Sequence, residues 1–215
     1  MKITKYEHAA LVVELNGDKV IVDPGSYIKT MPEQHNVKAI VITHIHDDHC
    51  SEPQLDLIVA NNPDVKIYGT DEVCRRLTES RPNFNTVAVH HGDFYKEGDF
   101  TIEFYGDMHL EIHSSWPICQ NVGVFINGSL YYPGDSYTIP DREVKMLALP
   151  TSAPWAKLGM MIDFANAVKP KHAFGTHNIH LSPEGHQMYE GRLKQIIESH
   201  GGGFTHLEPG DSIDA

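Results

Sequence analysis

The sequence predicts an α/β sandwich in which two β-rich halves are each closed by helices. Short apolar runs rich in β-branched residues alternate with segments of helical spacing in both halves of the chain. Asn16-Gly17 and Asn127-Gly128 each stand between two such runs, and an Asn-Gly pair in this setting is the strongest short-range signal for a β-hairpin. Because the 215 residues contain no linker or low-complexity stretch, we expect one domain that spans residues 1–215.

The first half begins with the hairpin and continues with alternating strands and helices. Its expected strands are residues 10–15, 19–22, 38–42 and 65–68. Ser51 is placed to cap a helix that has Pro53 in its first turn, and Thr70 opens a second helix. Asp23-Pro24-Gly25 ends the second hairpin strand, so this strand stops at a carboxylate.

The second half repeats the β-rich pattern and includes two helices. Its expected strands are residues 100–105, 122–126, 129–132, 145–149, 171–175 and 204–207. The spacing of apolar residues predicts a helix over 155–168 and another that starts at Ser182-Pro183-Glu184. In both halves polar residues gather just after the strands, where a rigid scaffold presents functional groups.

Histidine is the unusual feature of the composition. Fifteen His stand beside 17 Lys and Arg, and histidine is both the commonest protein ligand of metal ions and an acid or base near neutral pH. The formal net charge is −12, which disfavours nucleic acid as a partner, because binding to a phosphate backbone depends on Lys and Arg. The same acidic excess suits divalent cations. The composition therefore points to chemistry at a site that divalent cations would suit, and away from nucleic-acid binding.

The cysteines and the N-terminal residues bear on location. Cys50, Cys74 and Cys119 are odd in number and widely spaced, so we expect neither a disulfide framework nor a zinc ribbon, and a reducing compartment fits. The longest apolar run near the N-terminus, residues 9–13, is too short for a signal peptide or a membrane span. We therefore expect a cytoplasmic protein without membrane insertion, and the sequence leaves its oligomeric state open.

The central motif is His44-x-His46-x-Asp48-His49, directly after the buried strand at 38–42. In an extended chain residues two apart point to the same side, so His44 and His46 can hold one metal ion. The turn that follows can direct Asp48 and His49 to a second ion, and two ions about 3.5–4 Å apart can share one site. This spacing of candidate ligands predicts a dinuclear metal centre.

The remaining histidine ligands must come from other strand ends. His109 lies just past its strand and is preferred as a ligand of the first ion, with His113 as its rival four residues on. His177 lies at the end of a later strand and is preferred for the second ion, with His180 as its rival.

Two aspartates and a tryptophan also follow strands. Asp135 comes after Pro133-Gly134, and with the other ligands present a bridging role is preferred over an ordinary turn. Asp23 is expected to orient a ligating histidine rather than to bind metal itself. Trp155 follows the strand at 145–149 and is an equal candidate for the wall of a substrate cleft and for core packing.

The ordered set of these residues resembles the metallo-β-lactamase fold superfamily. The motif Thr-His-x-His-x-Asp-His is followed in order by a strand-end His, a Gly-Asp pair and a late strand-end His, so the match covers about residues 3–207. The resemblance implies a four-layer αββα sandwich with a dinuclear site at one edge of its two sheets. It implies the first metal at His44, His46 and His109, the second at Asp48, His49 and His177, and a bridge at Asp135.

The N-terminal segment narrows the resemblance. Tyr6-Glu7-His8-Ala9-Ala10-Leu11 resembles the start of the branch that includes ascorbate-6-phosphate lactonase-like and N-acylphosphatidylethanolamine phospholipase D-like hydrolases. This chain has Glu7 where that branch often has Gly, and it has no obvious cluster of Arg or Lys for a phosphate. The resemblance places His8 near the pocket.

The function implied is that of a metal-dependent hydrolase acting on a small-molecule ester, lactone or phosphodiester. A hydroxide that bridges two divalent ions would attack the carbonyl or phosphoryl centre, because metal binding lowers the pKa of water toward about 7. Asp48 would orient the hydroxide as well as bind metal, and His8 or His180 would protonate the leaving group. Zinc is the first choice for a His-rich set, with manganese and iron as alternatives.

Two other classes of function stay open on the sequence alone. A mononuclear non-haem iron oxidoreductase on the same fold would use two histidines and one carboxylate, and it would hold one iron per chain. A non-catalytic metal-binding protein would have closed coordination and no hydrolytic activity. Metal content and a substrate screen distinguish these classes from the hydrolase.

Overall fold

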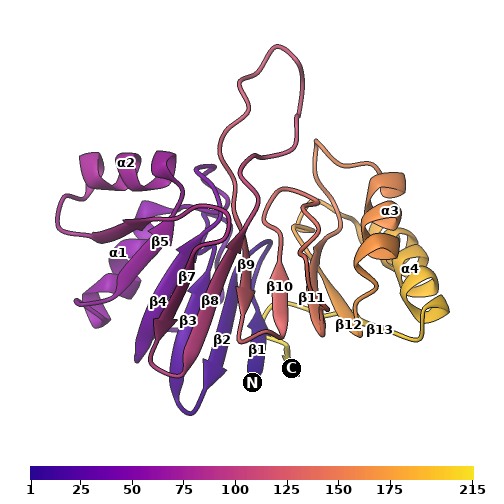
Figure 1. Ribbon diagram of the computed structural model, residues 1–215, viewed down its shortest axis with the longest axis horizontal. Coiled ribbons are helices and arrows are strands. Elements are labelled where there is room, and N and C mark those ends of the chain that lie inside the picture. Colours follow the sequence, from indigo (N-terminus) through magenta and orange to yellow (C-terminus); the bar gives the residue numbers. More distant parts are fainter.

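The computed structural model describes residues 1–215 and contains two seven-stranded sheets packed face to face (Figure 1). The first sheet has the order β14-β1-β2-β3-β4-β5-β6 and the second the order β13-β12-β11-β10-β9-β8-β7. The strands of the first sheet are β1 (Lys2–Lys5), β2 (Leu11–Leu15), β3 (Asp18–Val22), β4 (Val37–Ile42), β5 (Lys66–Gly69), β6 (Asn85–Ala88) and β14 (Ser212–Asp214). Those of the second are β7 (Phe94–Glu97), β8 (Phe100–Tyr105), β9 (Gly123–Ile126), β10 (Leu130–Tyr132), β11 (Met146–Pro150), β12 (His172–Thr176) and β13 (Gly203–Thr205).

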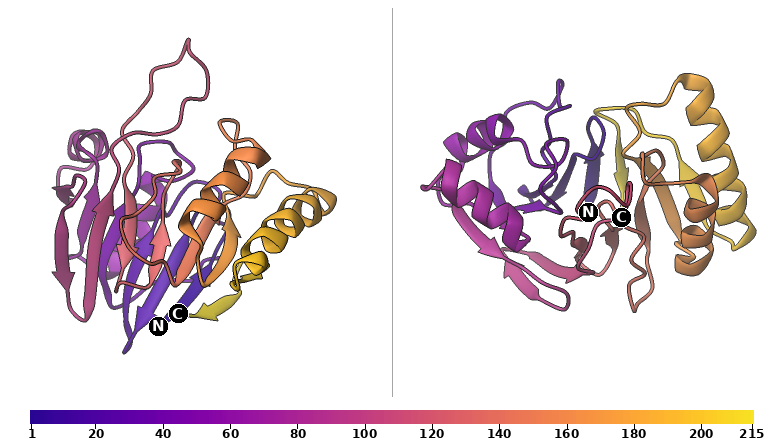
Figure 2. Two further views of the ribbon diagram at one scale, coloured as in Figure 1. Left: turned by 45° about the vertical axis from the view of Figure 1, so that its right-hand side comes forward. Right: turned by 90° about the horizontal axis from the view of Figure 1, so that it is seen from above.

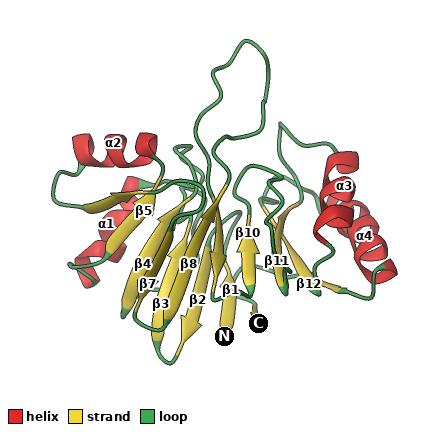
Figure 3. Ribbon diagram, viewed as in Figure 1, coloured by secondary structure: helices red, strands yellow, loops and turns green.

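Four helices cover the outer faces of the two sheets (Figure 3). They are α1 (Glu52–Asn61), α2 (Asp71–Ser80), α3 (Leu158–Val168) and α4 (Pro183–Ser199). Seen from above, the α1 and α2 pair lies at one side of the sheets and the α3 and α4 pair at the other (Figure 2). None of the four combines the length and apolar character that a membrane-crossing helix requires.

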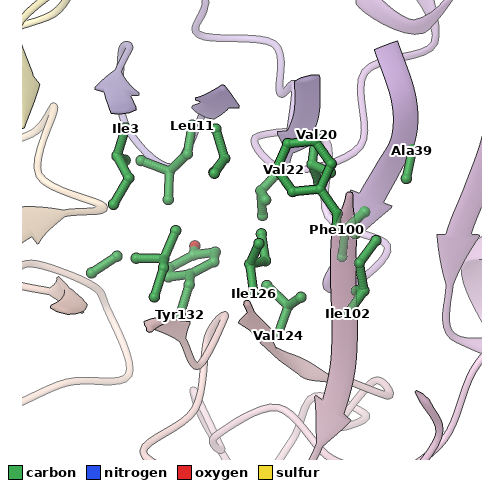
Figure 4. Packing of buried hydrophobic residues seen from close by; sticks show 14 of the residues in the cluster. Ile3, Leu11, Val20, Val22, Ala39, Phe100, Ile102, Val124, Ile126 and Tyr132 are labelled. Carbon is green, nitrogen blue, oxygen red and sulfur yellow. The ribbon is translucent and has the colours of Figure 1, made fainter. Parts of the chain in front are cut away.

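Three separate apolar cores hold the four layers together. The largest, with 22 buried residues, lies between the sheets, where Leu11 and Val22 of one sheet face Ile126 and Tyr132 of the other (Figure 4). A second core of 15 residues joins the first sheet to α1 and α2, and a third of 13 residues joins the second sheet to α3 and α4. One core per layer boundary is the packing of an αββα sandwich, so the predicted fold is confirmed.

The Asn-Gly hairpin signal and the helix start at Ser182 act as the sequence predicts, whereas the expected capping bond of Ser51 does not form. Asn16 and Gly17 have φ of 53° and 86°, so both central residues of the turn between β2 and β3 adopt the left-handed conformation that an Asn-Gly pair tolerates. Ser182 caps α4, because its hydroxyl accepts a hydrogen bond from the Gly185 amide at 3.1 Å. Ser51 occupies the N-cap of α1 but makes no such side-chain bond.

The structure adds strands that the sequence pattern does not reveal. The additions are β1, β6, β7 and β14, of which β6, β7 and β14 are edge strands. β6 has no fully buried residue, so it carries no apolar alternation that could predict it. Helix α3 begins at Leu158 rather than at residue 155, and the last predicted strand covers Gly203–Thr205 rather than 204–207.

The strand ends that carry the polar motifs meet at one edge of the sandwich. The long loop between β8 and β9, residues 106–122, rises from this edge, while both chain termini lie at the opposite edge (Figure 1). An isolated bridge between His44 and Asn121 ties the loop after β4 to the base of this loop. The fold therefore gathers segments from both sheets at one place.

Candidate metal centre

Eight side chains at this edge form two adjoining groups of metal-binding type. In each group the potential ligand atoms lie within 4.8 Å of one another. The first group is His44, His46, His109 and Asp135, and the second is His8, Asp48, His49 and His177. All seven residues expected as ligands from the sequence are therefore brought together, and His8 joins them.

Asp135 lies between the two groups. Its Oδ1 is 3.3 Å from His49 Nε2, and its Oδ2 is 3.1 Å from His177 Nε2. On the other side, Oδ2 is 3.3 Å from His109 Nε2 and 3.8 Å from His44 Nε2. One carboxylate therefore faces imidazoles of both groups, which is the position that a bridging ligand needs.

The turn before Asp135 fixes the position of this carboxylate. Gly134 has φ of 64°, and a Cβ added to it would lie 2.4 Å from Asn121 Oδ1, so only glycine fits. The side chain of Asn121 accepts a hydrogen bond from the Asp135 amide at 2.9 Å and donates one to Pro133 O at 3.0 Å. Asn121 thus holds both sides of the turn.

Asp23 contacts His49 of the second group on the ring nitrogen that faces away from the centre. It is fully buried, and its Oδ2 lies 2.7 Å from His49 Nδ1. The same carboxylate accepts hydrogen bonds from the amide and the hydroxyl of Thr43, both at 2.7 Å. A carboxylate bonded to Nδ1 leaves Nε2 of His49 free for a metal ion, which fits the orienting role expected from the sequence.

The histidines present free nitrogen atoms to the centre. Nδ1 of His109 bonds to Leu110 O at 2.5 Å, and Nδ1 of His177 bonds to Ser152 O at 2.6 Å. The Nε2 atoms of His49, His109 and His177, together with Asp135 Oδ1, are buried and have no hydrogen-bond partner. Buried polar atoms without partners are costly, and metal ions would satisfy all four.

The charges of the centre are coupled. Burial acts to raise the pKa of Asp135, but the imidazoles of His177 and His49 hold it well below its usual range, so this carboxylate is ionised. Burial acts to lower the pKa of His49, but the carboxylates of Asp135 and Asp23 raise it to about 9. Positive charge at the imidazoles therefore balances the buried carboxylates, and divalent ions could replace that charge.

The two candidate proton donors, His8 and His180, differ in burial and in their position relative to the cavity. His8 is buried, with its Nε2 3.1 Å from Asp48 Oδ2 and its ring 3.9 Å from that of His177. His180 is exposed and lines the open cavity over the centre, where its ring lies 5.4 Å from that of Tyr27. His8 does not line this cavity, so its position suits holding Asp48, whereas His180 faces the space a substrate would occupy.

The other histidines weighed from the sequence lie outside the centre. His113 is exposed and contacts Ser115, so the structure favours its rival His109 as a member of the cluster. His180 likewise lines the cavity rather than joining the cluster, and His177 takes the cluster position. His90 and His91 are exposed and belong to neither group.

Two aromatic residues lie at the centre, and the sequence offers only Trp155 as a candidate for the cavity wall and misses Tyr27. Trp155 is 6% exposed, and its Nε1 donates a hydrogen bond to Asp135 Oδ2 at 2.9 Å while its ring lines the cavity. Tyr27 lines the same cavity, and its ring lies 5.1 Å from that of His8 and 5.4 Å from that of His180. Each follows a strand by several residues in an irregular segment, so only the fold brings it to the metal ligands.

A four-layer sandwich with clustered imidazoles and carboxylates at one sheet edge defines a metal-binding protein of the metallo-β-lactamase type. Residues 2–177 match the family model for the β-lactamase superfamily domain. The chain belongs to this family, and the resemblance found in the sequence is confirmed.

Similar proteins extend over nearly the whole chain. Protein Rv0786c of Mycobacterium tuberculosis is 29% identical over 201 residues, which cover 91% of this chain and 92% of that protein. A UPF0173 metal-dependent hydrolase of Carboxydothermus hydrogenoformans is 27% identical over 195 residues, which cover 82% and 84%. Igni18, a metallo hydrolase from Ignicoccus hospitalis, has a solved structure that aligns with a TM-score of 0.71 at 21% identity and covers 99% of this chain and 97% of its own. This last likeness bears on the fold alone.

Proposed function

We propose that this metal-dependent hydrolase cleaves a neutral small-molecule ester or lactone at a centre of two zinc ions. The observation that carries the proposal is that no Lys or Arg lines the cavity over the centre. This cavity has a volume of about 520 Å³. Its lining residues are Ser26, Tyr27, His46, Asp47, Asp48, His109, Ile112, Asp135, Pro154, Trp155, His177 and His180. Apart from the metal ions themselves, a phosphate or carboxylate group would meet carboxylates there and no Lys or Arg side chain to compensate its charge.

Arg76, which contacts Asp47 of the cavity wall, also supports this choice of substrate. Arg76 donates to Asp47 Oδ1 at 2.8 Å, to Glu52 Oε1 at 3.3 Å and to Ile45 O at 2.8 Å. Its guanidinium is therefore engaged by two acids and a carbonyl, and it does not line the cavity. A phosphodiester would have to break these bonds to be bound by Arg76. We therefore favour the ester and lactone over the phosphodiester.

The side chains of the two groups would divide between the ions. His44, His46 and His109 would hold the first, Asp48, His49 and His177 the second, and Asp135 would belong to both. Imidazole-rich sets favour zinc, although iron and manganese also bind such sites, so elemental analysis of the protein decides the metal. When bound, the ions would activate the attacking water and polarise the substrate carbonyl.

The surrounding residues would orient the reactants. Asp48, 25% exposed at its side chain, faces the cavity and could accept a hydrogen bond from the attacking water. His8 would keep Asp48 in place through the 3.1 Å contact, and Trp155 would do the same for Asp135. His180 would protonate the leaving group from the cavity side.

A second cavity next to the first indicates an apolar part of the substrate. It has a volume of about 220 Å³ and shares His46, His109 and Ile112 with the first cavity. Its other lining residues are Leu110, Trp116, Pro117, Ile118 and Cys119, all from the loop after β8. A short alkyl or aryl group would fill this volume and exclude water from it.

The test is a substrate screen on protein reconstituted with Zn²⁺. p-Nitrophenyl butyrate and γ-lactones are compared with bis-p-nitrophenyl phosphate and p-nitrophenyl phosphate, with His46→Ala as the inactive control. We expect kcat/KM for the butyrate to exceed that for the phosphodiester by at least about 100-fold. Faster cleavage of the phosphodiester would overturn the substrate class. Turnover that requires oxygen with one iron per chain would favour the oxidoreductase, and no turnover at all would favour the non-catalytic protein.

The role of His180 has its own test, based on the leaving group. We expect His180→Gln to lower kcat for ethyl butyrate, whose alkoxide needs a proton, by about 100-fold, within the usual contribution of a general acid. The same variant should leave p-nitrophenyl butyrate nearly unchanged, because nitrophenolate leaves without a proton. His113→Gln, an exposed histidine outside the cavity, is the matched control. Equal losses on both esters would remove His180 from this role.

A further inference from the structure

A second cluster of metal-binding side chains lies away from the centre described above. His186 and Glu190 are four residues apart on α4, so they share one face of the helix. His206 comes directly after β13, and its ring lies 5.5 Å from that of His186. One potential ligand atom from each of the three residues lies within 4.8 Å of the others. We propose that His186, Glu190 and His206 form a further site for a divalent transition-metal ion of the zinc class.

The carboxylate at the middle of the cluster is buried and held in place. The side chain of Glu190 is 9% exposed, and its Oε1 lies 3.2 Å from His186 Nδ1 while its Oε2 lies 2.6 Å from His206 Nδ1. A Cβ added to Gly175 of β12 would lie 2.7 Å from Glu190 Oε1, so the carboxylate packs directly against the strand. Neighbouring ligands of a tetrahedral zinc ion are about 3.3 Å apart, given bonds of about 2.0–2.1 Å. The His186–Glu190 distance matches this spacing, and the 2.6 Å His206–Glu190 contact would lengthen when an ion replaces the shared proton.

A second carboxylate sets the orientation of His206. Nε2 of this ring is 3.0 Å from Glu208 Oε1, on the side away from Glu190. Glu208 is itself held by a hydrogen bond from its backbone amide to Asp211 Oδ2 at 2.9 Å. Metal-binding histidines usually donate their other ring N–H to a carboxylate, and here that arrangement directs Nδ1 of His206 toward Glu190.

The surroundings favour a cation and leave room around it. Four carboxylates, those of Glu7, Glu190, Glu208 and Asp211, act on the ammonium group of Lys5, and Lys194 is the other cation near the cluster. Negative charge is therefore in excess. The cluster opens to a cavity of about 600 Å³, the walls of which share no residue with the cavity over the first centre. An ion held by three side chains would keep an open position toward this cavity for water or a small ligand.

The site would join the last helix to the segment that follows β13. Glu190 and His186 belong to α4, whereas His206 lies in the C-terminal segment that leads to β14. An ion bound by both would cross-link two elements that otherwise meet through apolar packing and the hydrogen bonds above. It would stabilise the C-terminal segment without touching the proposed catalytic residues.

Metal content tests the proposal with Zn²⁺ alone as the probe. Wild type, His206→Ala and His186→Ala are loaded with excess Zn²⁺, dialysed against a weak chelator and analysed for zinc per chain. His200→Ala is the matched control, because this histidine ends α4 but bonds to Asn166 outside the cluster. We expect each cluster variant to hold one ion fewer than wild type and the control, with unchanged kcat/KM on the ester substrate. Circular dichroism confirms that each variant is folded.

The same measurement in a His46→Ala background separates the two sites. His46→Ala is expected to lose ester turnover, whereas adding His206→Ala to it should remove one further ion per chain. Binding of Co²⁺, followed by its visible absorption, gives a second readout that does not depend on turnover. Equal zinc content in wild type, His186→Ala and His206→Ala would overturn the proposal, because the cluster would then be held by hydrogen bonds alone.

Discussion

Replacement of Asp135 by asparagine is expected to lower kcat/KM for the ester substrate by about 10³-fold or more, equivalent to about 4 kcal/mol of transition-state stabilisation. The carboxylate lies within 3.3 Å of the Nε2 atoms of His49, His109 and His177, so it is shared by both ligand groups. Asparagine keeps the shape but removes the negative charge, and it places an N–H group where a metal ion would bind. Loss of at least one zinc ion per chain should accompany the loss of turnover.

The control for this variant is Asp163→Asn, an exposed aspartate on α3. Kinetics and zinc analysis are carried out on both variants at matched protein concentrations. If Asp135→Asn retained its zinc and more than about a tenth of its activity, a bridging role for this residue would be wrong, since a tenfold change corresponds to only about 1.4 kcal/mol. Trp155 should report the change independently, because its indole N–H bonds to the carboxylate, and we expect its fluorescence to change when that contact is altered.

The local order of the ligands could be predicted because each one follows a strand. His44, His46 and Asp48 lie within one short segment after β4, so the alternation of an extended chain is enough to group them. Asp135 and His177 are distant from this segment in the sequence, and a Gly-Asp turn and a strand end predict their places. The structure brings all of these together because β4, β10 and β12 end at the same edge of the sandwich.

What the sequence did not specify depends on contacts between distant segments. The choice of His109 over His113 follows from the path of the loop after β8. In this loop the amide of His109 donates a hydrogen bond to Cys119 O. Tyr27 enters the site through an irregular segment that has no periodicity to read, and for Trp155 the sequence leaves the cleft wall and core packing as equal alternatives. The cluster of His186, Glu190 and His206 joins two residues of α4 to one residue after β13. A His-Glu pair four residues apart is common on solvated helices, so the pair alone does not predict the cluster.

Asp23→Ala is expected to cause the largest loss of stability among the residues around the centre. The carboxylate is fully buried and accepts three hydrogen bonds, two from Thr43 and one from His49. Each buried donor left without a partner costs about 1–3 kcal/mol, so we expect the free energy of unfolding of the metal-free protein to fall by about 3 kcal/mol or more. Asp23 also has φ of 47°, a backbone conformation that alanine adopts less readily than aspartate.

Asp23→Asn separates the backbone contribution from that of the charge. Asparagine tolerates positive φ and keeps one acceptor oxygen, so its loss of stability should be smaller than that of alanine. Its effect on zinc should remain, because an amide cannot hold Nδ1 of His49 as a carboxylate does, and such outer contacts change metal affinity by about 10–100-fold. Urea unfolding of the EDTA-treated variants and zinc competition with a chelator measure the two effects, with the exposed Asp64→Ala as control. If metal-free Asp23→Ala were as stable as wild type, these three hydrogen bonds would not hold the loop after β4. The orienting role of Asp23 would then be wrong.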